Sequence, residues 1–208
     1  MRIFVAGATG AVGRSLVPRL IRNGHIVVGL TRTPAKTGLL RELGAEPVVA
    51  NALDESAIHA AVAAARPDVI VHQLTDLKGA LDLRKFDHAF ASSNRLRTTG
   101  TDYLLAAARA CGAKRMVAQS FCGWPYARDG GHVKTEDDPL DPNPPQEFRG
   151  TLDAIRHLEH AVTTAPGVAG VALRYGGFYG PGTGVFDPPM IEQIRKRRMP
   201  LIGGGTAW

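Results

Sequence analysis

A glycine-rich turn near the start of the chain restricts the fold more than any other feature. Gly7, Gly10 and Gly13 follow an apolar run at residues 2–6 and open a segment at 11–23 with apolar residues at helical spacing. In a strand–turn–helix unit, such glycines allow a tight turn, close approach of a pyrophosphate and close packing of helix on strand. The N-terminus of the helix favours negative charge. We therefore predict a dinucleotide-binding turn, rather than a plain structural turn, made of Gly7, Thr9, Gly10, Ala11, Val12 and Gly13.

Short β-branched runs alternate with helix-like runs along the rest of the chain. Strands are predicted at 2–6, 26–30, 46–50, 68–74, 114–120 and 168–174, and helices at 11–23, 35–43, 54–65 and 86–110. Asp54 is the predicted N-cap of the helix at 54–65. The strands are apolar on both faces, which is typical of a parallel sheet covered by helices on both sides. We therefore predict an α/β fold, a doubly wound parallel sheet of the Rossmann type with about seven strands. The last of these would be the short run at 200–202.

Length and composition exclude several other classes of protein. The chain has 208 residues, of which 44% are hydrophobic and 21% charged, as in an ordinary globular domain. Its two cysteines, Cys111 and Cys122, cannot form a disulfide framework, and no Cys-x-x-Cys motif indicates a zinc site. The sequence contains neither a secretory signal nor an apolar run of about 20 residues. We expect a cytoplasmic protein that does not associate with a membrane.

The net charge of +6 suggests anionic partners, but the basic residues are spread out. The single dense cluster, at 195–198, is typical of a solvated helix end, and no basic stripe interleaved with aromatic residues indicates nucleic-acid binding. A cofactor that carries phosphate groups would satisfy the same charge preference. We therefore expect a small-molecule substrate and no nucleic acid as partner.

The end of the second predicted strand indicates which dinucleotide binds. A carboxylate there would accept a hydrogen bond from the ribose 2′-OH of NAD. Residues 29–33 contain no carboxylate, and Arg32 instead has the charge and the forked geometry that suit a 2′-phosphate. The alternative is that Arg32 is a solvated loop arginine. We predict NADP as the cofactor, with NAD as the alternative.

These features resemble the short-chain dehydrogenase/reductase superfamily, and most closely its extended, NAD-dependent epimerase/dehydratase-like branch. The resemblance covers nearly the whole chain and rests on the turn at 7–13, the run at 68–75, Asn94 near the start of a long helix, and the loop at 179–182. It implies an NAD(P)-binding domain at 1–174 and the start of a substrate-binding portion at 175–208. Because members of the superfamily normally continue further, we expect that this portion is incomplete.

The resemblance also implies cofactor contacts outside the glycine turn. Adenine contacts fall in the loop after the third strand, where Asn51 replaces the usual aspartate. Backbone contacts follow the fourth strand, Asn94 holds the active-site geometry through its helix, and the end of the sixth strand lies against the nicotinamide. The residues implied are Ala52, Leu53, Leu74, Thr75, Asn94 and Tyr175. The resemblance is also compatible with a homodimer packed through the helix at 86–110 and a helix that begins at 149.

The catalytic motif of the superfamily is missing. That motif is a Ser or Thr after the fifth strand and a Tyr-x-x-x-Lys on the next helix, in which the lysine lowers the pKa of the tyrosine. None of the four tyrosines, at 103, 126, 175 and 179, has a lysine four residues later. In the superfamily an acidic residue follows the lysine by four positions. If Glu159 is that residue, the lysine position is Ile155 and the tyrosine position is Thr151. Ser120 matches the first serine of the superfamily pattern, and Phe121 occupies the usual catalytic position.

Other groups must therefore act if the protein is an enzyme. Tyr126, in the loop after the fifth strand, is a candidate proton donor, with loop packing as the alternative, and Ser120 is a candidate for orienting a carbonyl. His157 and His160 are too few to predict a metal site, and Cys122 is expected to be an inert thiol. Arg174, at a strand end, is assigned equally to structure or to a substrate anion.

Two classes of function remain open, with a third reading beside them. The first is an NAD(P)-dependent oxidoreductase or epimerase/dehydratase-like enzyme that acts on a small carbonyl or sugar-like metabolite. Gly177, where enzymes for sugar nucleotides usually carry Asn, weakens the sugar reading. The second is a non-catalytic NAD(P)-binding sensor or interaction protein, which the missing motif favours. The third reading is a structural remnant that binds nothing well.

Overall fold

A computed structural model describes residues 1–76, 85–131, 133–180, 183 and 188–198. The chain divides into two units, Met1–Tyr175 and Gly176–Trp208. The first unit contains the sheet and the helices that pack on it. In the second unit, the described residues include one helix, α7 (Pro188–Arg195).

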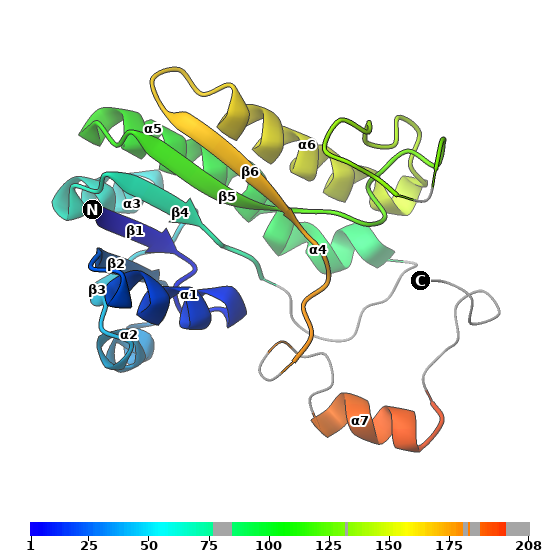
Figure 1. The fold of residues 1–208 in the computed structure, drawn as a ribbon, viewed down its shortest axis with the longest axis horizontal. Helices are drawn as coiled ribbons and strands as arrows, with labels where there is room; N and C mark the ends of the chain where they lie inside the picture. Colours follow the sequence, from blue (N-terminus) through cyan, green and yellow to red (C-terminus); the bar gives the residue numbers. More distant parts are fainter. Residues whose placement is uncertain (77–84, 132, 181–182, 184–187, 199–208) are drawn as a thin grey trace. The chain divides into compact units, whose positions relative to one another are not determined.

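The first unit is built on one parallel sheet in the strand order β3-β2-β1-β4-β5-β6 (Figure 1). The strands are β1 (Arg2–Ala6), β2 (Ile26–Thr31), β3 (Glu46–Val49), β4 (Val69–His72), β5 (Arg115–Phe121) and β6 (Ala169–Tyr175). Phe4 of β1 pairs with Val28 on one side and with Ile70 on the other. The strand order therefore reverses at β1, and the predicted doubly wound Rossmann-type sheet is confirmed. The seventh strand expected at 200–202 lies outside the described residues.

Helical segments connect the strands. They are α1 (Ala11–Arg22), η1 (Pro34–Lys36), α2 (Thr37–Glu42), α3 (Glu55–Ala65), α4 (Phe86–Arg95), η3 (Leu96–Gly100), α5 (Thr101–Cys111), η4 (Gln146–Phe148) and α6 (Arg149–Thr163). The long helix predicted at 86–110 is a continuous run of α4, η3 and α5, in which η3 is a π-helical turn. Such turns often occur at functional sites. The predicted N-cap of α3 is confirmed, because the Asp54 carboxylate accepts a 3.0 Å hydrogen bond from the Ala57 N–H.

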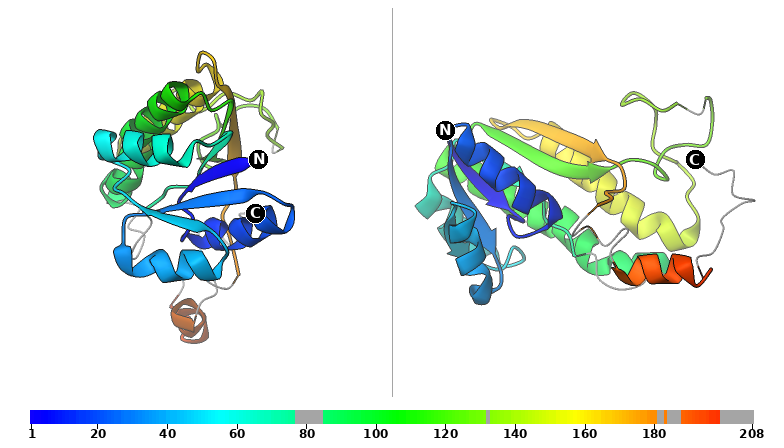
Figure 2. Two further views of the ribbon diagram at one scale, coloured as in Figure 1. Left: turned by 90° about the vertical axis from the view of Figure 1, so that its left-hand side faces the viewer. Right: turned by 60° about the horizontal axis from the view of Figure 1, so that its bottom comes forward.

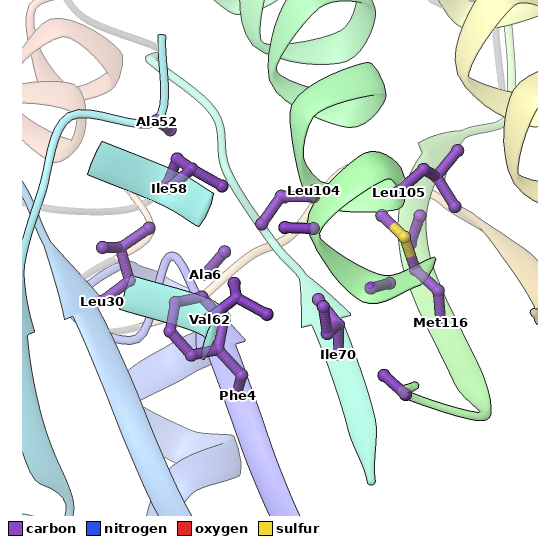
Figure 3. Close-up of a cluster of buried hydrophobic side chains, with 14 of the residues drawn as sticks. Phe4, Ala6, Leu30, Ala52, Ile58, Val62, Ile70, Leu104, Leu105 and Met116 are labelled. Atoms are coloured by element: carbon purple, nitrogen blue, oxygen red, sulfur yellow. The ribbon is translucent and has the colours of Figure 1, made fainter. Parts of the chain in front are cut away.

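Helices cover the two faces of the sheet in two groups (Figures 1 and 2). Side chains from α3, α5 and α6 pack on one face in a single core cluster, while α1 and α2 pack on the other. Figure 3 shows the first cluster around Phe4, Ile70 and Met116, all fully buried. Burial of each such side chain stabilises the fold by about 1.5–3 kcal/mol. No helix among the described residues is long and apolar enough to cross a membrane.

Candidate active site and cofactor site

The glycine turn between β1 and α1 leaves no room for side chains at two of its three glycines. Gly7 has a φ of +94°, and a Cβ there would lie 2.5 Å from the backbone oxygen of Gln73. A Cβ at Gly13 would lie 2.5 Å from the backbone oxygen of Ala8, and one at Gly10 would be 3.3 Å from that of Gly7. Only glycine fits at Gly7 and Gly13 without a shift of backbone. The turn therefore presents bare backbone at the carboxyl edge of the sheet.

The N-terminus of α1 has no side-chain cap among the described residues. Gly10 is the N-cap residue, and the first turn of the helix contains no acidic residue. The N–H groups of that turn and the positive end of the helix dipole therefore suit an anion. Gln73 beside the turn also has a buried side-chain oxygen, Oε1, with no hydrogen-bond partner in the described part of the chain. The bare glycines, the N-terminus of α1 and the unpaired side-chain oxygen of Gln73 together fit a dinucleotide, which carries a pyrophosphate and hydroxyl groups.

Arg32 follows β2 and is paired with a carboxylate that sequence reasoning missed. Its Nη2 lies 3.4 Å from both carboxylate oxygens of Asp76, which follows β4. Ser92 Oγ donates a 2.9 Å hydrogen bond to Asp76 Oδ2, and the Asp76 N–H donates to Ser93 Oγ. The pair joins the carboxyl ends of β2 and β4, on either side of the glycine turn. Arg32 remains half exposed and accessible to a ligand.

The residues to which the resemblance assigned adenine contacts and backbone contacts to the cofactor follow β3 and β4 at the same sheet edge. Asn51 organises the loop after β3, because its side-chain oxygen accepts a 3.1 Å hydrogen bond from the Leu53 N–H. Ala52 is buried in the core, whereas Leu53 is partly exposed. After β4, Thr75 is exposed, and the Leu74 N–H donates to His72 Nδ1.

His72, at the end of β4, is fully buried and neutral. Burial lowers the pKa of its imidazole to about 4, with the nearby charge of Arg97 acting in the same direction. Because Nδ1 accepts from Leu74, the proton resides on Nε2, which lies 3.1 Å from Thr101 Oγ1. His72 therefore holds the end of β4 against α5 and does not act as a proton donor at neutral pH.

Thr151 stands at the position counted as that of the family tyrosine, and it is a structural residue. It is 1% exposed, and its hydroxyl donates a 2.6 Å hydrogen bond to Asp87 Oδ1 and accepts one of 2.9 Å from Asn94 Nδ2. Asp87 also accepts hydrogen bonds from the N–H groups of Gly150 and Thr151. It therefore caps α6 from α4, a helix that lies far away in the sequence. Ile155, at the counted lysine position, is fully buried.

Arg97, in η3, extends this network and was missed by the sequence analysis. It is 7% exposed, and its Nη1 donates a 3.2 Å hydrogen bond to Asn94 Oδ1. Burial lowers the pKa of its guanidinium to about 10, which leaves it charged at neutral pH. A polar helix such as residues 86–100 is ordinarily a solvated one, so no local pattern could have revealed this buried cation.

The two candidate catalytic residues belong to a second network, on the α6 side of β5 and β6. Ser120 Oγ donates a 2.5 Å hydrogen bond to Glu159, which forms a two-point ion pair with Arg174 at 2.8 and 2.9 Å. Arg174 in turn donates to the Tyr126 hydroxyl at 3.2 Å and lies over the Tyr126 ring. The hydrogen bonds that Arg174 donates to Glu159 raise the pKa of the Arg174 guanidinium. The network thus brings Ser120 and Tyr126 together through Glu159 and Arg174.

A cavity of about 700 Å³ opens beside this second network. It is lined by residues of the second half of α6, of β6 and of the loop after β5, namely Glu136, Leu140, Arg156, Glu159, His160, Thr163, Ala172, Leu173, Arg174 and Tyr175. Tyr175, assigned by resemblance to the nicotinamide end, pairs with Phe121, and its carbonyl accepts from the Cys122 N–H. An aromatic cluster of Phe86, Phe90, Trp124 and Phe148 holds the loop after β5 against α4.

His157 and His160, the pair considered for a metal site, have other neighbours in the structure. His157 Nε2 lies 2.8 Å from Asp102 Oδ1 on α5, and His160 lines the cavity. Within the described ranges, no group of three His, Cys, Asp or Glu side chains is placed to hold a metal ion.

A comparison of the sequence with family models settles the assignment. The model of the NAD dependent epimerase/dehydratase family matches residues 3–208. The chain belongs to the NAD-dependent epimerase/dehydratase family. The recognition made from the glycine turn and the run at 68–75 is thereby confirmed. The family is NAD-dependent, which agrees with the bare glycine turn and the uncapped α1.

Curated relatives of this family include reductases. The chain is 44% identical over 210 residues to a 3-diazoavenalumate denitrifying reductase from a Streptomyces species, covering 99% of this chain and 66% of that protein. It is 28% identical over 210 residues to a 2-alkyl-3-oxoalkanoate reductase from Stenotrophomonas maltophilia, covering 99% of this chain and 59% of that protein. The chain therefore spans less than two thirds of either relative.

Solved structures of the epimerase/dehydratase family share the fold. The Bordetella bronchiseptica enzyme WbmG, in complex with NAD and UDP, superposes with a TM-score of 0.70 at 19% identity, covering 97% of this chain and 61% of that one. At this identity the likeness supports the fold alone.

Proposed function

We propose that the chain is the dinucleotide-binding part of an NADP-dependent reductase. The observation that carries this proposal is the bare glycine turn in front of the uncapped N-terminus of α1. When bound, the reduced nicotinamide supplies a hydride. In this proposal residues 1–174 bind the cofactor and residues 175–208 begin the part that binds substrate. The match of residues 3–208 to the NAD dependent epimerase/dehydratase family supports the cofactor class.

Each cofactor residue has a role in the proposal. The turn of Gly7, Thr9, Gly10, Ala11, Val12 and Gly13 holds the pyrophosphate, and Arg32 binds the 2′-phosphate. Adenine lies against Ala52 and Leu53, and Leu74 and Thr75 contact the cofactor through their backbone. Asn94 and Tyr175 serve the nicotinamide end. Arg32 favours NADPH over NADH, although Asp76 competes with the phosphate for its guanidinium.

The names of two reductases that align with 99% of this chain favour reduction over epimerisation and suggest the substrate class. Two relatives that cover 99% of this chain are named as reductases of an alkanoate and of a diazoavenalumate, which are anions of acids. We therefore assign to this chain a small carboxylate that carries a reducible group. A homodimer is part of the proposal only through the family resemblance.

A carbonyl substrate would need a proton as well as a hydride. With Thr151 and Ile155 buried, we assign the proton to Tyr126. Arg174 donates a hydrogen bond to the Tyr126 hydroxyl, which fixes the position of that hydroxyl. Ser120 acts through Glu159, which orients Arg174.

A diazonium substrate would need no such donor. A diazonium cation that receives a hydride becomes a C–H bond and dinitrogen: the hydride electron pair forms the new bond, and the C–N pair leaves with the nitrogen. The missing Tyr-x-x-x-Lys motif and the 44% identical relative both favour this substrate.

Turnover with two substrates tests these assignments. NADPH oxidation is followed with a 3-oxoalkanoate and with an aromatic diazonium carboxylate, in the unchanged protein and in Tyr126→Phe. Loss of 3-oxoalkanoate reduction in Tyr126→Phe, with NADPH binding retained, supports Tyr126 as the donor. Diazonium reduction that survives in Tyr126→Phe supports the donor-free route. Binding of NADPH with turnover of neither substrate favours the alternative of a non-catalytic sensor or interaction protein.

A further inference from the structure

Arg97 is a buried cation that has no acidic partner among the described residues. It is 7% exposed, and the ion pairs among the described residues do not include it. Its side-chain hydrogen bond within the described part of the chain goes to a neutral group, the side-chain oxygen of Asn94, at 3.2 Å. Buried charges in proteins are ordinarily paired, because removal of an ion from water is unfavourable unless an opposite charge or several hydrogen bonds replace the water. A guanidinium in this state is prepared for an anion that binds from outside.

The carboxylate at the far end of the hydrogen-bond chain from Arg97 is already in use. A chain of hydrogen bonds runs from Arg97 through Asn94 and Thr151 to Asp87. Both oxygens of Asp87 accept hydrogen bonds from the first turn of α6. Asp87 therefore holds the helix in place and leaves the remaining donors of the guanidinium to another group.

The position of Arg97 indicates whether its guanidinium faces the substrate or the phosphates of the cofactor. Its charge acts on His72 at the carboxyl end of β4, and its hydrogen-bond partner Asn94 reaches the first turn of α6. Ligands of doubly wound sheets bind at the carboxyl ends of the strands. The pyrophosphate position assigned above lies at α1, which packs on the opposite face of the sheet from α5 and α6. Arg97 is therefore placed for the substrate rather than for the phosphates of the cofactor.

We propose that Arg97 binds the carboxylate group of the substrate. This inference rests on the proposed function, which it deepens by naming the residue that selects an acid. The planar guanidinium presents paired N–H groups that match the two oxygens of a carboxylate, and such charge-assisted pairs are strong where water is excluded. An uncharged substrate of the same shape leaves the cation unpaired and binds more weakly.

Binding of benzoate and benzamide in the presence of saturating NADP tests the proposal. The two probes have the same shape and differ in charge. Their affinities are measured by protein-observed NMR titration at constant ionic strength, in the unchanged protein, in Arg97→Gln and in Arg97→Lys. Gln keeps a donor for Asn94 and removes the charge. Arg95→Gln, one of the last residues of α4 and exposed, is the matched control because it removes one charge from the same helical run.

The unchanged protein and Arg95→Gln are expected to bind benzoate more tightly than benzamide. Arg97→Gln is expected to lose benzoate affinity by about tenfold or more, and Arg97→Lys to restore part of it. Benzoate binding that is equal in Arg97→Gln, or absent from the unchanged protein, would overturn the proposal. So would an equal loss of NADPH affinity in Arg97→Gln, which would assign the guanidinium to the cofactor. Failure of the unchanged protein to bind NADPH would instead reject the proposed function, on which this inference rests.

Discussion

Asn94 and Thr151 are joined by a 2.9 Å hydrogen bond from the amide nitrogen of Asn94 to the hydroxyl of Thr151. This bond ties the end of α4 to the beginning of α6, and Asp87 completes the joint from the first turn of α4. The position counted as that of the family tyrosine is thus a structural joint in this chain. Any proton needed in the reaction must come from another group.

Replacement of Asp87 is expected to loosen this joint. Asp87→Asn places an amide N–H against one of the donors at Gly150 and Thr151, so α6 loses part of its cap. We expect the free energy of unfolding to fall by about 1–3 kcal/mol, as measured by urea titration. Asp153→Asn, exposed on α6, is the control and should change it by less than about 0.5 kcal/mol. Equal effects of the two substitutions would show that Asp87 is not the cap.

The glycine turn gives a steric prediction. In Gly13→Ala the new methyl group would lie 2.5 Å from the Ala8 backbone oxygen, so the turn must shift. We expect a destabilisation of about 1–3 kcal/mol and loss of most dinucleotide affinity, measured by thermal unfolding and calorimetry. Gly38→Ala, in α2, is the control because a methyl group there meets no atom within 4 Å. Retention of full NADPH affinity in Gly13→Ala would place the cofactor elsewhere.

Arg32 and Asp76 are expected to set the choice of dinucleotide. Arg32→Gln should weaken NADPH binding by about tenfold and leave NADH binding nearly unchanged. Asp76→Asn keeps an acceptor for Ser92 and removes a charge 3.4 Å from Arg32. It should tighten NADPH binding by roughly fivefold, because it removes about 1 kcal/mol of repulsion between the Asp76 carboxylate and the 2′-phosphate.

The double variant Arg32→Gln/Asp76→Asn separates coupling from general charge effects. If the pair acts as a unit, the gain from Asp76→Asn disappears once Arg32 is replaced. Asp129→Asn, exposed in the loop after β5, controls for net charge. Parallel changes in NADPH and NADH affinity across these variants would argue against a role for the pair in selectivity.

His72 makes stability depend on pH in the acid range. Its pKa is about 4 in the folded protein, because of burial, and 6.5 for an ordinary imidazole. Between these values the unfolded chain binds a proton that the folded chain does not, so stability falls as the pH decreases from 6.5 towards 4. The full loss is about 3 kcal/mol, and none of it arises above pH 6.5.

Urea unfolding at several pH values, in the unchanged protein and in His72→Gln, measures this contribution. The unchanged protein should lose more stability on acidification than His72→Gln does. An identical dependence on pH in both proteins would show that His72 is not held neutral by burial.

The local sequence pattern was sufficient to predict the fold class and the glycine turn. The turn at Gly7, Gly10 and Gly13 lies between a strand and a helix that are each defined by neighbours in sequence, so its chemistry could be predicted. The N-cap at Asp54 depends on a residue three positions away and was predicted for the same reason. The parallel, doubly wound sheet followed from the alternation of strands with helices.

Contacts between distant parts of the chain could not be predicted in this way. Asp87 caps a helix that begins more than sixty residues later, and Asp76 meets Arg32 across 44 positions. Arg97 was missed because its burial depends on α6 packing over the π-helical turn, which no periodicity shows. Ser120 and Tyr126 were proposed separately, and their link through Glu159 and Arg174 emerged only from the structure.

Calorimetric titration of the 208-residue chain with NADPH and with NADH tests the central claim most directly. The account predicts micromolar or tighter binding, with NADPH bound more tightly than NADH because of the charge on Arg32. Such binding would also raise the midpoint of thermal unfolding, since a ligand that binds only the folded state stabilises it. Binding of neither dinucleotide would contradict the account, because the glycine turn and the N-terminus of α1 would then lack the function assigned to them.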